Sequence, residues 1–92
     1  MNRYDFWVGI DWASQAHEVC VLRSDQSLAM QRTVKHDGEA LGRFCDELLR
    51  LANGNVGRVA VAIEVPRGPV VETLLDRGFA VYAINPKQLD RF

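Results

Sequence analysis

Two short apolar runs, each ending in a carboxylate, constrain the fold of this 92-residue chain more than any other feature. Residues 6–10 run into Asp11, and residues 59–63 run into Glu64. Runs of this length that are rich in Val and Ile and bounded by polar residues are typical of buried strands. If the two strands are parallel neighbours, both carboxylates lie at their carboxyl ends, the edge where open α/β sheets bind ligands.

The stretch between the two runs predicts a β-hairpin and a helix. Residues 16–23 and 28–34 are strand-like, and residues 24–27 carry turn chemistry, so they form a hairpin whose second, more polar strand lies at the sheet edge. Asp37 is a candidate N-cap for the helix that follows, and Asn53-Gly54 supplies a left-handed stop. The predicted buried stripe of this helix consists of Leu41, Phe44, Cys45, Leu48 and Leu49.

The second half of the chain repeats a strand–helix pattern. Residues 58–63 predict the fourth strand, and Pro69 suits the first turn of a helix that ends at Arg77-Gly78. Residues 79–84 predict a fifth strand, and Asn85-Pro86 begins a third helix. The second helix is expected to bury Val70, Val71, Leu74 and Leu75. The polar residues 1–5 are expected to fray.

The element order is therefore β-β-β-α-β-α-β-α in a single α/β domain. Three strands in hairpin succession followed by β-α-β crossovers imply a mixed five-stranded sheet of order 3-2-1-4-5. The second strand runs antiparallel to the first, with Val19 and Val21 on one face and Cys20 and Leu22 on the other. The fourth and fifth strands run parallel to the first.

Composition excludes several function classes. The net charge of −1 and the pI near 6.1 lack the basic footprint of an autonomous nucleic-acid-binding domain. Cys20 and Cys45 are the only cysteines and have no Cys-x-x-Cys spacing, so we expect reduced packing residues rather than a zinc site. No signal peptide or membrane-spanning run is present, and a reducing cytoplasmic setting is the default expectation.

Several motifs together resemble one protein family. They are Val8-Gly9-Ile10-Asp11-Trp12-Ala13-Ser14, Ala62-Ile63-Glu64, Arg67-Gly68-Pro69 and the run from Gly78 through Ile84-Asn85-Pro86-Lys87-Gln88. These stretches look like the amino-terminal, RuvC-like domain of DEDD transposases of the insertion-sequence-110 type, which are bridge-RNA-guided recombinases related to Piv invertases. The resemblance covers nearly the whole chain and implies a ribonuclease-H-like fold.

The resemblance also implies a Mg²⁺-dependent site of four acidic residues that cleaves and transfers DNA strands with a guide RNA. Asp11 and Glu64 match the first two acids. The second pair, and the family's carboxyl-terminal domain with its catalytic serine, have no match before Phe92. We therefore expect residues 1–92 to be the N-terminal part of such a domain, incomplete at the C-terminus, inactive alone and weak in Mg²⁺ binding, whereas the parent protein is an enzyme.

Other residues near the expected edge are candidates for nucleic-acid contact. They are Arg67, Lys87, Trp12 and Ser14. For each, a structural role is the alternative: a solvated loop or helix charge for Arg67 and Lys87, packing for Trp12 and a turn hydroxyl for Ser14. His17 and His36 lack metal-ligand partners in the sequence, and surface or strand-packing roles are favoured.

Two other function classes remain open from the residues. Actin-like and sugar-kinase ATPases also begin with a strand ending in Gly-Ile-Asp, but their phosphate loop needs glycine directly after the acid, where this chain has Trp12-Ala13. A non-catalytic module that binds nucleic acid or forms a homodimer is the other alternative, because an incomplete sheet leaves apolar surface uncovered.

Overall fold

The pairing of five strands into one mixed sheet organises the chain. A computed structural model describes residues 4–64 and 68–84. Its sheet has the order β3-β2-β1-β4-β5, in which β1 pairs antiparallel with β2 and parallel with β4. The strands are β1 (Phe6–Asp11), β2 (Ala16–Arg23), β3 (Leu28–Lys35), β4 (Val59–Ile63) and β5 (Ala80–Ala83).

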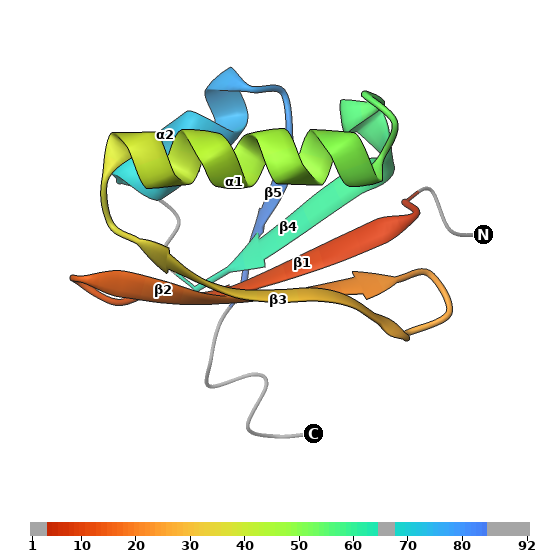
Figure 1. The fold of residues 1–92 in the computed structure, drawn as a ribbon, viewed down its shortest axis with the longest axis horizontal. Coiled ribbons are helices and arrows are strands. Elements are labelled where there is room, and N and C mark those ends of the chain that lie inside the picture. Colours follow the sequence, from red (N-terminus) through yellow and green to blue (C-terminus); the bar gives the residue numbers. More distant parts are fainter. Residues whose placement is uncertain (1–3, 65–67, 85–92) are drawn as a thin grey trace.

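Two helices cover the same face of this sheet (Figure 1). They are α1 (Gly38–Leu51) and α2 (Pro69–Asp76), and a 3₁₀ turn, η1 (Val56–Arg58), leads into β4. Within residues 4–64 and 68–84, no helix lies against the opposite face of the sheet. Side chains that alternate along β1 and β4 therefore point either into the helix-covered core or onto this open face.

The core lies between the sheet and the two helices. Ile10 and Ile63 are in register on β1 and β4 and are buried, and Val19 and Val21 of β2 point the same way. The helices contribute an apolar stripe, which consists of Ala40, Leu41, Phe44, Cys45 and Leu48 from α1 and Val70, Val71 and Leu74 from α2. Removing this apolar surface from water is the main stabilising contribution to the fold.

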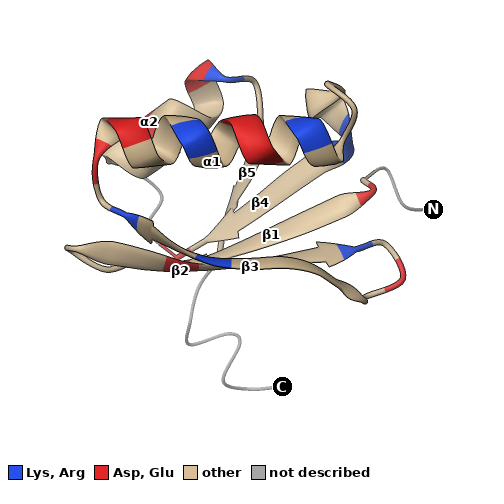
Figure 2. Ribbon diagram, viewed as in Figure 1, with Lys and Arg blue, Asp and Glu red and all other residues tan. Residues whose placement is uncertain are grey.

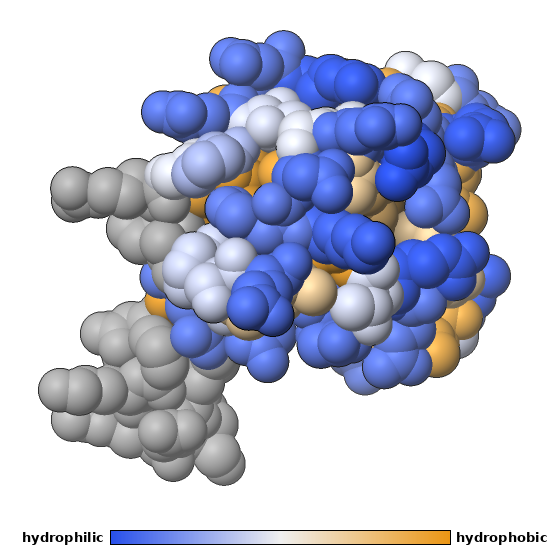
Figure 3. Space-filling view, turned by 60° about the vertical axis from the view of Figure 1, so that its left-hand side comes forward, coloured by the Kyte–Doolittle hydropathy of each residue, from blue (hydrophilic) through white to orange (hydrophobic). Residues whose placement is uncertain are grey.

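The outward side of α1 carries charges of both signs. Basic and acidic residues alternate along the helix (Figure 2). Arg32 on β3 lies 3.5 Å from Glu47 on α1, so an exposed ion pair links the edge strand to the helix. A turned view of the molecule shows a mostly hydrophilic surface with small apolar patches between the charged groups (Figure 3). The charge on this side is mixed, in agreement with the near-neutral composition.

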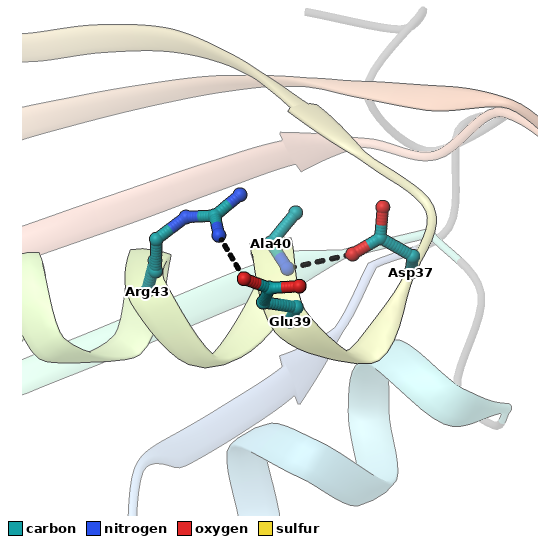
Figure 4. Close-up of polar contacts among 4 residues, drawn as sticks. All are labelled: Asp37, Glu39, Ala40 and Arg43. Carbon is teal, nitrogen blue, oxygen red and sulfur yellow. Dashed lines mark hydrogen bonds and ion pairs between the residues drawn. The ribbon is translucent and has the colours of Figure 1, made fainter.

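The start of α1 is held by the N-cap that the sequence predicts. The Asp37 carboxylate accepts a hydrogen bond of 2.7 Å from the backbone N–H of Ala40, and Glu39 pairs with Arg43 one turn further along (Figure 4). An oxygen acceptor at this position satisfies one of the free N–H groups of the first turn. The helix is followed by Asn53 and Gly54, both with positive φ, as the left-handed stop requires.

The strand order, the parallel and antiparallel pairings and the hairpin of the predicted fold are confirmed. The arrangement is that of the ribonuclease-H-like α/β fold. Strand ends differ slightly: β3 extends to Lys35, β4 begins at Val59 after the 3₁₀ turn, and β5 is limited to Ala80–Ala83. The predicted helix from Asn85 lies outside the described residues.

Two predictions about individual residues are wrong. Leu75 is 55% exposed, because α2 rests on the core through Val70, Val71 and Leu74, and Leu75 is rotated about 100° from Leu74 around the helix axis. Fraying does not extend to Asp5, whose carboxylate accepts two hydrogen bonds from Arg58 and whose N–H donates to the Arg58 carbonyl. An ion pair distant in sequence thus ties the N-terminal end of β1 to η1.

Candidate functional site

The register of β1 and β4 places the two predicted acids side by side. Ile10 pairs with Ile63 in the parallel ladder, Asp11 is the last residue of β1, and Glu64 directly follows the last residue of β4. Since alternate residues face opposite sides of a sheet, Asp11 belongs to the open face while both isoleucines point into the core, and Glu64 lines the same surface hollow as Asp11. Asp11 and Glu64 are exposed to solvent. The two strands therefore deliver their acids to the same rim of the same face.

A shallow hollow of about 320 Å³ lies at this rim. Asp11 and Glu64 both line it, and Gly9 and Ala62, which are in register one step back on the strands, form its floor. These two residues have little or no side chain, so a ligand could approach the backbone of the central strands closely. The hollow thus combines two carboxylates with an unobstructed floor.

Glu18 is a third acid at this hollow, and the sequence analysis did not single it out. It pairs directly with Asp11 across the antiparallel β1–β2 ladder, and it lines the same hollow. Its carboxylate accepts hydrogen bonds of 2.9 and 3.2 Å from the Thr33 hydroxyl. The alternation of β2 could have indicated Glu18, because Val19 and Val21 occupy the opposite face, but the register with Asp11 depends on the folded hairpin.

The segment that follows Asp11 is tied to two histidines. The Ala13 N–H donates to Nδ1 of His17 at 3.1 Å, and Nε2 of His17 lies 2.9 Å from Nδ1 of His36. His17 is buried, which together with the nearby charge of His36 lowers its pKa below the ordinary value of 6.5, burial being the larger cause. Surface or strand-packing roles were predicted for both histidines, and the buried ring of His17 agrees with packing.

The remaining candidate residues fall into two groups. Trp12 is 39% exposed, its ring centroid lies 6.0 Å from that of His17, and Ser14 is exposed on the same segment. Both therefore lie on the chain directly after Asp11. Arg67 and Lys87 lie outside the described residues.

The cysteines and the other tryptophan are structural in this fold. Cys20 and Cys45 are both free, as predicted; Cys45 is buried in the core, and burial raises the pKa of its thiol. Trp7 packs against Tyr4 and Tyr82 on the open face, with ring centroids 5.2 and 6.2 Å away. This aromatic cluster lies on β1 and β5, toward the opposite end of β1 from Asp11.

The donors at the rim fit a hard divalent cation. Mg²⁺ takes oxygen ligands, retains several waters and is often bound through one or two carboxylates, which is what Asp11 and Glu64 offer on an exposed rim. A group of three or more His, Cys, Asp or Glu side chains placed to hold a metal does not occur within residues 4–64 and 68–84. The donor chemistry therefore suits Mg²⁺, and these residues supply only part of a coordination shell.

Fold and rim together define a ribonuclease-H-like domain with acidic residues at the carboxyl ends of neighbouring parallel strands. A family profile described as a transposase, of the IS110-type DEDD class, matches residues 8–92. The chain belongs to this family of IS110-type DEDD transposases. The resemblance stated from the sequence motifs is thereby confirmed.

Two relatives share the matched region. One is “Putative transposase y4uE” of Sinorhizobium fredii, 47% identical over 87 residues, which are 94% of this chain and 24% of the relative. The other is “Mini-circle putative transposase for IS117” of Streptomyces coelicolor, 29% identical over 84 residues, which are 91% of this chain and 20% of the relative. The chain thus spans about a quarter and a fifth of the lengths of these proteins. Neither helix in the described part of the chain is long and apolar enough to cross a membrane.

Proposed function

We propose that this chain supplies the first half of a Mg²⁺-dependent acidic site with which an IS110-type transposase cleaves and transfers DNA strands. The observation that carries the proposal is the register of β1 and β4, which brings Asp11 and Glu64 to one rim and one hollow. Membership of the IS110-type DEDD transposase family supports it, because the resemblance to that family implies a site of four acidic residues of which Asp11 and Glu64 match the first two.

The proposed roles follow from the positions of the two strands. Two Mg²⁺ ions in a complete site would activate the attacking oxygen and stabilise the leaving oxygen of a phosphodiester. Asp11, on the central strand, and Glu64, one strand away, would hold these ions through their carboxylate oxygens. The small floor residues Gly9 and Ala62 leave room above the sheet for the sugar–phosphate backbone.

The proposed partners are DNA and, in the full-length protein, a guide RNA. Trp12 and Ser14 are exposed on the segment after Asp11, where an aromatic ring can stack on a base and a hydroxyl can donate to a phosphate. Arg67 and Lys87 remain proposed phosphate contacts. Self-association into a homodimer through the open face is a further proposal.

Metal binding is tested directly with Mn²⁺, which is paramagnetic and takes the same oxygen ligands. We expect Mn²⁺ to broaden the amide resonances of β1 and β4 near Asp11 and Glu64 in the 92-residue chain, and Mg²⁺ to compete. Asp11→Asn should abolish the broadening. The matched control is Glu72→Gln, which removes an exposed carboxylate from α2, on the other side of the sheet. Equal broadening in wild type and Asp11→Asn would refute the site.

Activity requires more ligands than the described residues offer, so we expect no DNA cleavage by the chain alone. The assay incubates the purified 92-residue chain with labelled DNA and Mg²⁺. Robust cleavage that disappears in Asp11→Ala would overturn the proposal that the chain alone is inactive, while supporting the assignment of Asp11.

A further inference from the structure

A chain of hydrogen bonds holds the segment that follows Asp11. The backbone N–H of Ala13 donates to Nδ1 of His17 at 3.1 Å, and the other nitrogen of that ring, Nε2, lies 2.9 Å from Nδ1 of His36. The loop is also closed on its other side, where the N–H of His36 donates to the carbonyl of Gln15 at 2.9 Å. Residues 12–15 are thereby attached to β2 and to the end of β3.

The hydrogen bond from the Ala13 N–H determines which ring nitrogen carries the proton in each histidine. A backbone N–H can only donate, so Nδ1 of His17 must be the acceptor and the proton of the neutral ring must lie on Nε2. That Nε2–H then donates to Nδ1 of His36, which must also be unprotonated. In the neutral pair, both histidines therefore carry their protons on Nε2.

We propose that His17 and His36 are positioning residues that hold residues 12–15 beside Asp11, and that one added proton releases this hold. A proton on Nδ1 of His36 would face the Nε2–H of His17, and two donors cannot bond. If His17 instead moved its own proton to Nδ1, it would accept from His36 but its Nδ1–H would face the Ala13 N–H. Every placement of the added proton breaks one of the two bonds, and those that keep the stronger, charge-assisted bond between the two rings put a proton on Nδ1 of His17 and so lose the bond from Ala13.

Within residues 4–64 and 68–84, no carboxylate lines the pocket around the His17 ring. The His17 ring packs among apolar residues of β1, β2, β3 and both helices, together with Thr73 of α2 and the thiol of Cys45 on α1. Burial raises the pKa of that thiol and keeps it neutral. Asp11 and Glu18 face the opposite side of the sheet.

The charged residues next to His36 in the sequence are Lys35 and Asp37. Lys35 precedes it, and Asp37 follows it with its carboxylate bonded to the Ala40 N–H at the start of α1. On α2, Glu72 and Asp76 are exposed, and neither lines the pocket that contains His17. Burial, followed by the charge of His36, lowers the pKa of His17, and His36 itself is half-buried.

The released segment carries the two side chains that we place next to DNA. The Trp12 ring lies 6.0 and 6.2 Å from the centroids of His17 and His36, so it is held by the same pair. The link to catalysis rests on the proposed function, since a loose segment would order Asp11, Trp12 and Ser14 less well. The hydrogen-bonded pair itself does not depend on that function.

The test uses NMR of the 92-residue chain and one matched variant. In His36→Asn, the side-chain amide oxygen can accept from His17 Nε2–H near the position of the replaced Nδ1 but cannot take a proton in this range. We expect Ala13 amide exchange to be equal in the two proteins near pH 8. Near pH 5.5, it should be about tenfold faster in wild type than in His36→Asn, because the loss of one hydrogen bond is worth about that factor.

A second readout needs no variant. The ¹⁵N shifts of the imidazoles near pH 8 should show both Nδ1 atoms unprotonated and both Nε2 atoms protonated. A protonated Nδ1 on His17 near pH 8, or Ala13 exchange that depends on pH equally in wild type and His36→Asn, would overturn the proposal. Neither readout involves metal or DNA, so its failure leaves the Mn²⁺ test of Asp11 and Glu64 standing.

Discussion

If Asp11 and Glu64 face each other at one rim, their charges must repel in the absence of metal. Neighbouring strands lie about 4.8 Å apart, so in-register carboxylates on one face are roughly 5–6 Å apart. Both groups are exposed, and two unit charges at that distance in water with physiological salt repel by about 0.5 kcal/mol. Neutralising Glu64 should therefore stabilise the metal-free chain by about this amount, and neutralising Asp11 should stabilise it by at least as much, because Asp11 also lies opposite Glu18.

The perturbation is a double-mutant cycle of Asp11→Asn and Glu64→Gln. Each single substitution removes the repulsion between Asp11 and Glu64, so the double variant should be no more stable than Asp11→Asn alone, and the coupling energy should be about 0.5 kcal/mol. For a domain of this size the corresponding rise in Tm is about 2–4 °C. Glu72→Gln on α2 is the matched control for the loss of one exposed carboxylate and should show no coupling with Asp11→Asn.

Added Mg²⁺ should reverse the order of stability. With a dissociation constant on the order of 1 mM, about 10 mM Mg²⁺ stabilises the wild-type chain by about 1.4 kcal/mol, or roughly 6–11 °C in Tm. The double variant should show none of this shift. The assay is thermal unfolding followed by circular dichroism at matched ionic strength. Additive single substitutions without metal, together with equal Mg²⁺ shifts in wild type and the double variant, would refute the shared rim.

Three predictions concern the scaffold. Asp37→Ala should destabilise the chain by about 1 kcal/mol in urea unfolding, because the Ala40 N–H loses its acceptor, whereas Asp37→Asn should be nearly neutral. Leu48→Ala, at a fully buried position, should cost about 3–5 kcal/mol, whereas the same change at the exposed Leu75 should cost under about 0.5 kcal/mol; equal costs would contradict the packing. Stability should fall as pH drops through the unfolded-state value of 6.5, because the lowered pKa of buried His17 means that the unfolded chain binds more protons; a Tm constant from about pH 8 to 5 would exclude this.

Much of the local structure follows from the sequence because its causes are local. Alternating or continuous Val and Ile runs indicate the strands, helical spacing of apolar residues indicates α1, and Asp37 and Asn53-Gly54 indicate its two ends. Each signal depends on neighbours within one or two turns. The parallel arrangement of β1 and β4 also follows, since a helical crossover between neighbouring strands makes them parallel.

Contacts between segments that are distant in the sequence could not be predicted from such local patterns. The apolar pattern of α2 included Leu75, but only packing decides which side of a short helix meets the sheet. The Asp5–Arg58 pair joins residues that are far apart in the sequence, and its partners carry no pattern that would indicate each other.

The sequence by itself determined the types and order of the elements and the two strand ends that carry Asp11 and Glu64, because these depend on side-chain periodicity and local turn chemistry. Only the tertiary structure decided that Glu18 lies opposite Asp11 and that Ala13, His17 and His36 form one hydrogen-bonded chain. The physical reason is that the register across a hairpin, and the meeting of two strand ends, depend on how the whole sheet and its helices pack together.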